Sequence, residues 1–385
     1  MRSVRPLACF LLVGCSAEVL DLGPSDALPD AGVASDAGFV EPCEVGFVEG
    51  RRIEHPARLV PVALVASVTA QPSGFHVALP IETVADGRPA SGVAGLRYAR
   101  EGGEPTPLFV LMESVNFAHA IFERDVGYAI AFSSTRPDFR AVAYYVSPIG
   151  RARSSGTFSN DLIRGAVQDD DGVAIFTHDE RRLRRRVYSM EDPPRGVTFD
   201  LDLPTPTEVV TVDGVDYVAY DDEGDVTGQL GVAALDPSGS ATQYLVQGPD
   251  EAQVVHAAAF GREIALLFRQ DDQLRVAAFD PATRALRFGA DIARAPDRGF
   301  TQFAAVDGAI AVAYAPRGAA YVELFVFDAD LAPLAGSPFL PNVVIKNPRL
   351  GMSLAGHRGA FALTTSSGED DEVEHALALF EACTQ

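Results

Sequence analysis

Short apolar runs and polar turns centred on glycine alternate along most of this chain, in a pattern that recurs seven times. Each unit has an apolar stretch, a glycine turn, a second apolar run, a polar loop and a third apolar run. The turn glycines are spaced 42–53 residues apart and stand at Gly74, Gly127, Gly172, Gly214, Gly261, Gly308 and Gly359. Short apolar runs bounded by Gly and Pro are typical of β-strands, and no helical period runs through them. The pattern therefore predicts an all-β repeat protein.

A repeat of about 40–50 residues with several short strands per unit is typical of a β-propeller. We predict a single propeller over residues 43–385 with seven four-stranded blades; six or eight blades and a pair of β-sandwiches are alternatives. The last unit ends in its third strand near the C-terminus, and the segment EVGFVEG (44–50) has no partner of its own. We expect this segment to supply the missing outer strand, so that N- and C-terminal strands pair and close the ring.

The N-terminus differs from the repeats. Two arginines precede an apolar run, PLACFLLVG (6–14), that is too short to cross a bilayer. The run ends in LVGC (12–15), which resembles the lipobox of bacterial lipoproteins. The resemblance covers only the first 15 residues and implies that residues 1–14 are a signal peptide and that Cys15 carries the acyl chains. Ser16 after the cysteine resembles the pattern that favours sorting to the outer membrane.

The segment after Cys15 is acidic and of low complexity. Residues 16–42 contain six acidic side chains and no basic one, and they are rich in Ala, Asp, Gly and Pro. Such a segment cannot bury enough apolar surface to offset its chain entropy, so we expect residues 15–42 to be a disordered tether of roughly 30 Å r.m.s. length. Signal and tether together predict an exported protein, anchored by lipid in the outer membrane or at the cell surface of a Gram-negative bacterium.

Lipidation of Cys15 and removal of the signal peptide leave Cys43 and Cys383 as the remaining cysteines. Cys383 ends the last third strand and Cys43 precedes the expected outer strand, so closure of the ring brings the two together. Because export exposes cysteines to an oxidising compartment, we predict a Cys43–Cys383 disulfide. Two buried thiols are the alternative.

Composition narrows the partners. The chain has 385 residues, 47% of them hydrophobic, and its formal charge of −22 disfavours nucleic acid as a partner. The seven histidines show no metal-ligand spacing, and no glycine-rich nucleotide motif opens a helix. No tryptophan is present, which excludes the tryptophan signatures of named propeller subfamilies. We predict no cofactor and no nucleic-acid partner, and we expect a monomer.

Five arginines form the densest charge cluster of the chain: Arg181, Arg182, Arg184, Arg185 and Arg186. We place them in a loop (177–186) between the second and third strands of the third unit. In propellers such loops lie on one face, together with the starts of the innermost strands. The cluster is a candidate site for polyanions, lipid phosphates or acidic glycans, because guanidinium groups bind oxyanions bidentately. A solvated loop paired with neighbouring carboxylates is the favoured interpretation.

Two weaker candidates remain. Asp221, Glu223 and Asp225 form an acidic turn that resembles part of a calcium loop, because hard cations prefer several oxygen ligands on a tight turn. No bidentate Glu follows at the usual spacing, so we favour a solvated turn and predict no metal. His119 and His256 lie on predicted innermost strands and are candidate ligand-binding residues, although such histidines more often have a structural role.

These observations leave two classes of function open. The first is a lipid-anchored, non-enzymatic binding or scaffold module with a protein or glycan ligand on the charged loop face. The second is an envelope enzyme, a hydrolase or lyase acting on glycans or other polymers at the mouth of the central channel. An enzyme requires carboxylates or histidines that converge there. The predicted inner strands are mostly Ala, Val, Phe, His and Thr, so we favour the binding module and assign no catalytic residue.

Overall fold

The computed structural model describes most of the repeat region. The described residues run from 45 to 382, with gaps at 55–59, 62–64, 86–87, 112–114, 125–126, 135–140, 147–151, 158–161, 170–171, 180–181, 189–194, 200–204, 223–228, 247–251, 271–272, 295–299, 317–320, 336, 339–349 and 370–371. The predicted signal peptide, tether, Cys15, Cys43 and Cys383 lie outside this part of the chain. Within it, no helix is long and apolar enough to cross a membrane.

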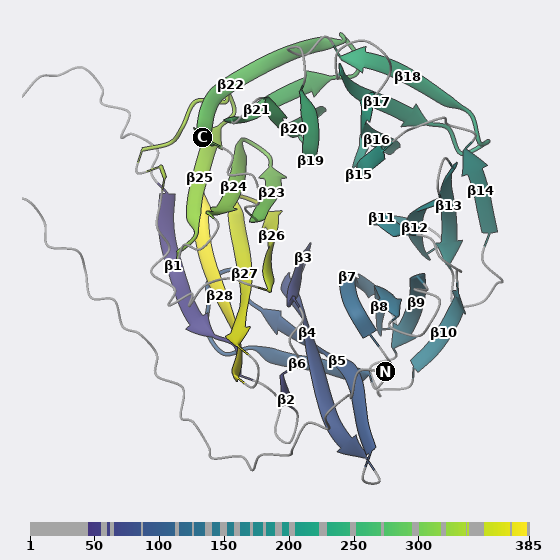
Figure 1. Cartoon of the computed structure of the whole chain (residues 1–385), viewed down its shortest axis with the longest axis vertical. Helices are drawn as coiled ribbons and strands as arrows, with labels where there is room; N and C mark the ends of the chain where they lie inside the picture. Colours follow the sequence, from purple (N-terminus) through teal and green to yellow (C-terminus); the bar gives the residue numbers. More distant parts are fainter. Residues whose placement is uncertain are drawn as a thin grey trace, which may run out of the picture.

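The described residues form antiparallel sheets arranged around a common centre (Figure 1). The first three sheets in chain order are β2 (Val60–Pro61), β3 (Ser67–Gln71), β4 (Gly74–Ala85), β5 (Arg88–Tyr98) and β6 (Thr106–Leu111); then β7 (Val115–Arg124), β8 (Gly127–Ser134), β9 (Ala141–Val146) and β10 (Ala152–Thr157); then β11 (Leu162–Asp169), β12 (Gly172–Asp179), β13 (Arg182–Tyr188) and β14 (Arg195–Phe199). The next three are β15 (Thr205–Val212), β16 (Val215–Asp222), β17 (Gln229–Leu235) and β18 (Ala241–Val246); then β19 (Gln253–Phe260), β20 (Glu263–Gln270), β21 (Gln273–Asp280) and β22 (Ala285–Arg294); then β23 (Phe300–Val306), β24 (Ala309–Ala315) and β25 (Glu323–Asp328). The last sheet joins β1 (Val45–Arg52) from the N-terminal end of the described residues to β26 (Gly351–His357), β27 (Ala360–Glu369) and β28 (Glu372–Ala382).

The innermost strands of these sheets form a closed ring. Strands β3, β7, β11, β15, β19, β23 and β26 each contact the next strand in this order, and β26 contacts β3. The protein is therefore a single β-propeller, as the spacing of the glycine turns predicts.

The ends of the chain close the ring as predicted. Strand β1 pairs antiparallel with β28, from Val45 opposite Ala382 to Arg52 opposite Ala376. A further backbone hydrogen bond from the Ile53 N–H to the carbonyl oxygen of His375 (2.8 Å) extends the junction, and one from the Ala382 N–H to that of Gly359 (2.8 Å) extends the neighbouring β27–β28 ladder. The segment EVGFVEG therefore supplies the outer strand of the last blade.

The prediction of seven four-stranded blades is wrong in its strand count. Among the described residues, six sheets have four strands or more, and the sheet of β23, β24 and β25 has three. After β25 the Asp328 carboxylate accepts hydrogen bonds from the Asp330 and Ala332 N–H groups (both 2.9 Å) and fixes a turn. The returning chain bridges to β25 opposite Phe327: the Leu334 N–H donates to the Val326 oxygen (2.8 Å), and the Asp328 N–H donates to the Ala332 oxygen (2.9 Å). Within the described residues, the outer edge of β25 therefore pairs with this short returning segment and not with a fourth strand.

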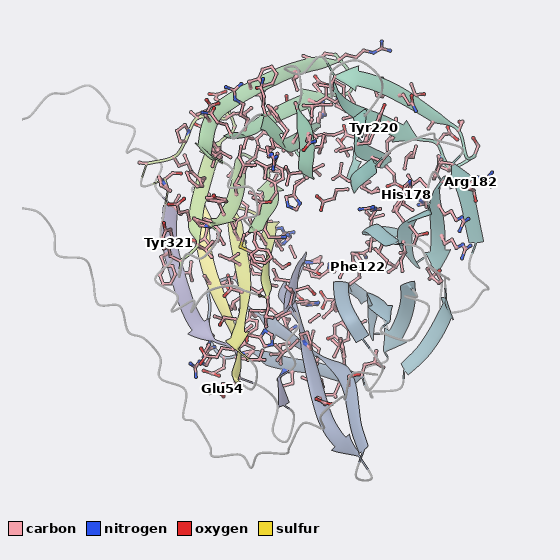
Figure 2. All side chains as sticks on the ribbon, viewed as in Figure 1. Glu54, Phe122, His178, Arg182, Tyr220 and Tyr321 are labelled. Carbon is pink, nitrogen blue, oxygen red and sulfur yellow. The ribbon has the colours of Figure 1, made fainter. Side chains whose placement is uncertain are left out.

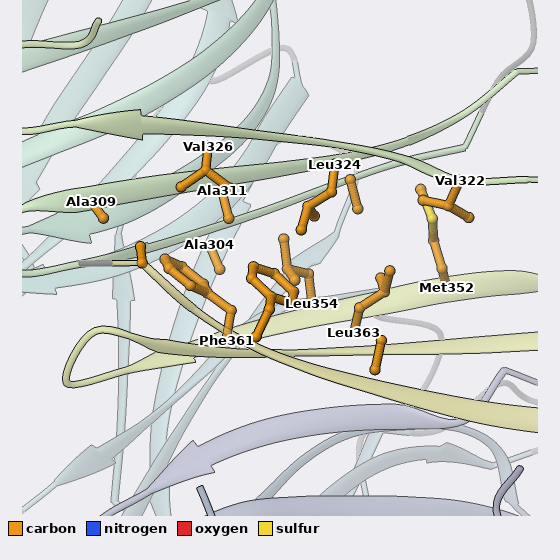
Figure 3. Packing of buried hydrophobic residues seen from close by; sticks show 14 of the residues in the cluster. Ala304, Ala309, Ala311, Val322, Leu324, Val326, Met352, Leu354, Phe361 and Leu363 are labelled. Carbon is orange, nitrogen blue, oxygen red and sulfur yellow. The ribbon is translucent and has the colours of Figure 1, made fainter. Parts of the chain in front are cut away.

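The hydrophobic core lies between adjacent sheets. In Figure 3, Ala309, Ala311, Leu324 and Val326 face Leu354, Phe361 and Leu363 of the next sheet, together with Ala304, Val322 and Met352. All seven side chains of β24 (AIAVAYA) are buried, because its alanines pack toward the β26–β28 sheet and the larger side chains between them pack toward the β19–β22 sheet. Burial of one large side chain such as Phe361 stabilises the fold by about 2–3 kcal/mol.

Five of the seven turn glycines have positive φ in the described structure: Gly74, Gly214, Gly261, Gly308 and Gly359. At the β15–β16 turn, Asp213 and Gly214 both have positive φ (49° and 76°), as a two-residue hairpin turn requires. Gly74 has φ 134°, and a Cβ there would lie 2.3 Å from the main-chain carbonyl oxygen of Tyr98. Glycine is therefore needed at Gly74 both for its conformation and for the close approach of β5.

Candidate functional site

The two faces of the ring differ in the segments they carry. Gln253 at the start of β19 pairs with Arg269 at the end of β20, and Gln270 pairs with Gln273 at the start of β21. The starts of the inner strands and the loops between second and third strands therefore share one face, which we call the loop face. The glycine turns lie on the opposite face, which we call the turn face.

Four inner strands carry a β-bulge close to their loop-face ends. Register shifts fall between Ala118 and Ala120, Ile163 and Gly165, Pro206 and Glu208, and Val254 and His256. A bulge inserts one extra residue and changes the direction of the side chains beside it. The bulges therefore position the side chains that follow, including Glu208 and His256. Sequence reasoning did not identify these bulges.

Glu208 bridges two adjacent inner strands. Its Oε2 accepts a hydrogen bond from the Ala257 N–H of β19 (3.0 Å) and lies 3.4 Å from Nδ1 of His256. The Glu208 side chain is 37% exposed, so one side of the carboxylate remains open to solvent. A carboxylate that accepts a backbone N–H at the inner edge of a strand satisfies a donor that no further strand can pair.

His256 continues the bridge to the next blade. Its Nε2 lies 3.0 Å from the main-chain oxygen of Thr301 on β23 and 3.4 Å from the Thr301 Oγ1. Because a carbonyl oxygen only accepts, the shorter contact requires Nε2 to carry a proton and donate. The structure thus gives the predicted binding candidate His256 a bridging contact between β19 and β23.

Other polar side chains on inner strands make similar bridges. The Val68 N–H donates to Ser353 Oγ (3.1 Å), and the Ile121 N–H donates to Thr69 Oγ1 (3.2 Å). The Glu123 N–H donates to the side-chain oxygen of Gln71 (2.9 Å). A polar residue on an inner strand of this ring therefore commonly holds the next blade.

We call the loop-face ends of β11, β15, β19 and β23 the inner rim, defined by Arg164, Glu208, His256 and Thr301.

A buried hydroxyl–histidine pair lies where the first blade meets the last. Ser366 Oγ lies 2.8 Å from Nδ1 of His375 and accepts a hydrogen bond from the Ala66 N–H (2.9 Å). Thr364 Oγ1 donates to the Ala66 oxygen (2.6 Å). The side chains of Thr364, Ser366 and His375 are all fully buried. Because a substrate cannot reach them, they fasten the junction of the ring and do not form an active site.

The arginine cluster lies on a strand and not in the predicted loop. Arg182, Arg184, Arg185 and Arg186 belong to β13, which pairs with both β12 and β14, whereas Arg181 lies outside the described residues. Arg185 Nε donates to Oδ2 of Asp216 on the next blade (3.0 Å), and its guanidinium lies 5.8 Å from the centre of the Phe176 ring.

Strand alternation divides this cluster. Arg184 and Arg186 share one face of β13 and are half-buried, and Arg185 lies on the other face. Only Arg182 among the described arginines of the cluster is exposed, and it lies toward the outer rim of the ring (Figure 2). The run of charges concealed Leu183 and Val187, whose alternation is the strand signal that could have corrected the loop assignment. The four side chains therefore do not form one continuous basic patch.

The weak metal candidates are not assembled in the described part of the chain. Asp221 lies on β16, paired with Thr205 and Leu230, whereas Glu223 and Asp225 lie outside the described residues. His119 belongs to β7, and its side chain is also outside them. Among the described residues, no group of three or more His, Cys, Asp or Glu side chains could hold a metal ion.

His76 on β4 is a buried histidine with an altered acidity. Its side chain is fully buried, Nε2 lies 3.2 Å from Ser73 Oγ, and Nδ1 has no hydrogen-bond partner in the described structure. Burial lowers the pKa of His76 from 6.5 to about 4, because the charged form loses its hydration. Arg97 lowers this pKa further, and Glu123 opposes the shift. His76 is therefore neutral in the folded protein at neutral pH.

Comparison with known proteins confirms the fold alone. No family model matches the chain, and no curated protein matches its sequence. Among solved structures, a puromycin-hydrolyzing peptidase from Mycobacterium tuberculosis is similar over 83% of this chain, with a TM-score of 0.55 and 14% identity. The WD40 domain of Toxoplasma gondii coronin is similar over 88% of each chain, with a TM-score of 0.53 and 11% identity. A periplasmic gluconolactonase from Pseudomonas aeruginosa covers 74% of this chain with a TM-score of 0.47 and 17% identity.

The chain spans about half the length of the first of these neighbours, since it covers 51% of the peptidase. All these identities lie well below the level at which a shared activity follows from a shared fold. The neighbours with TM-scores above 0.5 include a peptidase and a WD40 domain, so the fold by itself does not distinguish an enzyme from a binding module.

Proposed function

We propose that this chain is a lipid-anchored β-propeller of the cell envelope that acts as a non-enzymatic binding or scaffold module. The anchor rests on the LVGC sequence at residues 12–15, with Cys15 as the acylated residue. The ligand, a protein or a glycan, contacts the loop face. On this interpretation the propeller supplies a rigid binding surface and the N-terminal lipid keeps it at the membrane.

One observation supports binding over catalysis most directly. The acid and base of the inner rim, Glu208 and His256, are both bonded to the backbone of a neighbouring strand. A general acid or base must be able to exchange its proton with a substrate. Side chains that hold adjacent blades together are poorly suited to that task, whereas they give the loop face a fixed shape.

The anchor is tested by replacing the acylated cysteine. Cys15→Ala is expected to move the exported protein from the membrane fraction to the soluble fraction, because several acyl chains are needed for stable attachment. Cys383→Ala is the matched control and is expected to remain with the membranes. Retention of the exported Cys15→Ala protein in the membrane fraction would contradict lipidation at this residue.

A second candidate function is supported by the order of groups on the inner rim. Glu208 faces Nδ1 of His256, and Nε2 of the same ring faces the Thr301 hydroxyl, each at 3.4 Å. This order of carboxylate, imidazole and hydroxyl is that of a hydrolase triad. The Thr301 carbonyl competes for Nε2 at 3.0 Å, which disfavours proton transfer from the hydroxyl in the observed arrangement.

The two candidates differ in a measurable way. We expect the purified full chain to show no turnover of puromycin, lactones or p-nitrophenyl esters. Turnover that disappears in Thr301→Val and persists in Arg182→Gln, an exposed control on a distant strand, would favour the hydrolase. Absence of turnover in the wild-type chain, together with saturable binding of an envelope glycan or protein, would favour the binding module.

A further inference from the structure

Arg164 occupies an unusual place on the inner rim. It is the third residue of β11 and the extra residue of the bulge between Ile163 and Gly165. Its side chain is half-buried, so it is neither a core residue nor a freely solvated one. Because β11 begins at the loop face, Arg164 lies near that face, on the strand that precedes Glu208 of β15 in the ring.

The guanidinium of Arg164 lacks the partners that other arginines of the chain have. In the described structure it forms no hydrogen bond or ion pair, and its Nε is buried without a partner. By contrast, Arg185, Arg275 and Arg287 each contact a carboxylate at 3.0 Å or closer. Burial lowers the pKa of Arg164, since nothing offsets the lost hydration of its charge. A half-buried cation without a counter-ion in a chain of net charge −22 requires an explanation.

Comparison of two seams between blades identifies what is missing beside Arg164. At the β15–β19 seam, the residue after the bulge is Glu208, and its carboxylate accepts the Ala257 N–H. At the β11–β15 seam the corresponding residue is Gly165, which has no side chain. Val209 of β15 pairs with Val218 in the same relation to its bulge as Ala257 pairs with Leu266. The β11–β15 seam therefore has a cation and a corresponding main-chain donor, but no carboxylate.

The chain cannot supply this carboxylate from position 165. A Cβ on Gly165 would lie 3.1 Å from the Cβ of Val209, closer than ordinary contacts allow. Among the described residues, none supplies an acceptor for Arg164, and we infer that the acceptor belongs to a ligand. Glu208 on the adjacent strand is 37% exposed and gives the inner rim a negative charge. Because like charges repel, this carboxylate disfavours a ligand group with two negative charges.

We propose that Arg164 binds the carboxylate group of a monoanionic ligand at the loop-face end of the β11–β15 seam. The ligand class is a small organic carboxylate, or a glycan or peptide that presents one. This site deepens the proposed binding function, on which it rests, by assigning the chemistry of part of its ligand. Guanidinium and carboxylate groups match in geometry and form paired hydrogen bonds.

Acetate tests the site against its neutral analogue. At constant ionic strength, acetate is expected to raise the melting temperature of the purified full chain, and acetamide is not. Arg164→Gln is expected to weaken the acetate effect at least tenfold, whereas the exposed control Arg182→Gln retains it. An equal acetate effect in wild type and Arg164→Gln would overturn the proposal, and a larger effect of phosphate than of acetate would overturn the assignment of a monoanion.

A second variant and a crystal soak test the site independently of whether Arg164→Gln folds. Arg164→Lys retains the charge but not the planar fork, and it is expected to bind acetate several-fold more weakly than wild type; equal binding would overturn the paired geometry. Crystals soaked in bromide should show an anomalous peak beside Arg164, and absence of that peak would contradict an anion site. Membrane fractionation of Cys15→Ala tests the anchor independently, so failure of the anchor leaves the acetate result unchanged.

Discussion

Replacement of His76 is expected to change how the stability of the propeller depends on pH. The side chain is fully buried with one ring nitrogen unpaired, and burial lowers its pKa from 6.5 to about 4. In the unfolded chain the same histidine titrates near its ordinary value. Between these two pKa values the unfolded state therefore binds more protons than the folded state, and the free energy of unfolding falls as the pH falls. The loss is complete below the folded pKa.

The size of this effect follows from the shift. One pKa unit corresponds to 1.36 kcal/mol, so a shift from 6.5 to about 4 costs about 3 kcal/mol once the pH lies below both values. The same linkage gives a loss of about 2.5 kcal/mol at about pH 4.5 and close to zero at about pH 7. In His76→Gln this contribution is absent. Loss of the aromatic contact with Tyr128, whose ring centre lies 5.8 Å away, lowers stability at every pH instead.

Urea unfolding of wild type and His76→Gln at both pH values separates the two effects. The difference in free energy of unfolding between the proteins should shift by about 2.5 kcal/mol in favour of the variant between about pH 7 and about pH 4.5. Comparing wild type with the variant at the same pH cancels the contribution of other titrating groups. These include His357, since burial lowers its pKa as well. A difference that is the same at both pH values would refute the argument that His76 is buried in its neutral form.

The bridges and the ring closure lead to three further predictions. Glu208→Ala should lower the free energy of unfolding by about 1–3 kcal/mol because the Ala257 N–H loses its acceptor, and Glu208→Gln should lower it less; equal losses would contradict the bridge. Arg185→Ala should cost about 2 kcal/mol in urea unfolding by leaving Asp216 without its ion pair, and an unchanged midpoint would argue against this contact. A non-reduced digest should yield a linked Cys43–Cys383 peptide, since the neighbouring Val45 and Ala382 lie opposite each other; two separately alkylated peptides would refute the disulfide.

Much of the architecture could be predicted because it depends on local chemistry. Two-residue turns such as Asp213–Gly214 require positive φ, and the residues that tolerate it are visible in the sequence. The pairing of β1 with β28 followed from an unpaired segment at one end of the chain and a missing strand at the other. The sheet with only three described strands was not predicted, because its edge depends on a turn that Asp328 fixes after β25. The turn returns the chain to Val326, and this contact is not visible in the sequence alone.

The candidate site was less predictable because it depends on register. A one-residue bulge before Glu208 and His256 determines which neighbouring strand each side chain reaches, and a single sequence does not reveal a bulge. His256 was recognised as an inner-strand residue, but its partner Thr301 lies 45 residues away on another blade. Glu208 carried a usable signal, since it is an acidic residue within the apolar run TPTEVVTV. The arginines of β13 were misplaced because their charge concealed the alternation of a strand.

The pairing of β1 with β28 also determines how the molecule bears a load. Val45 enters the ring beside Ala382 and the Gly359 turn, on the face opposite the loops, and β1 then runs toward the loop face. Tension applied through the N-terminal end therefore acts along β1, in shear, so that the hydrogen bonds of the ladder resist together and do not unzip one at a time. On the proposed lipid anchoring, a pull on the N-terminal segment would therefore enter the propeller at the turn face, opposite the loop face.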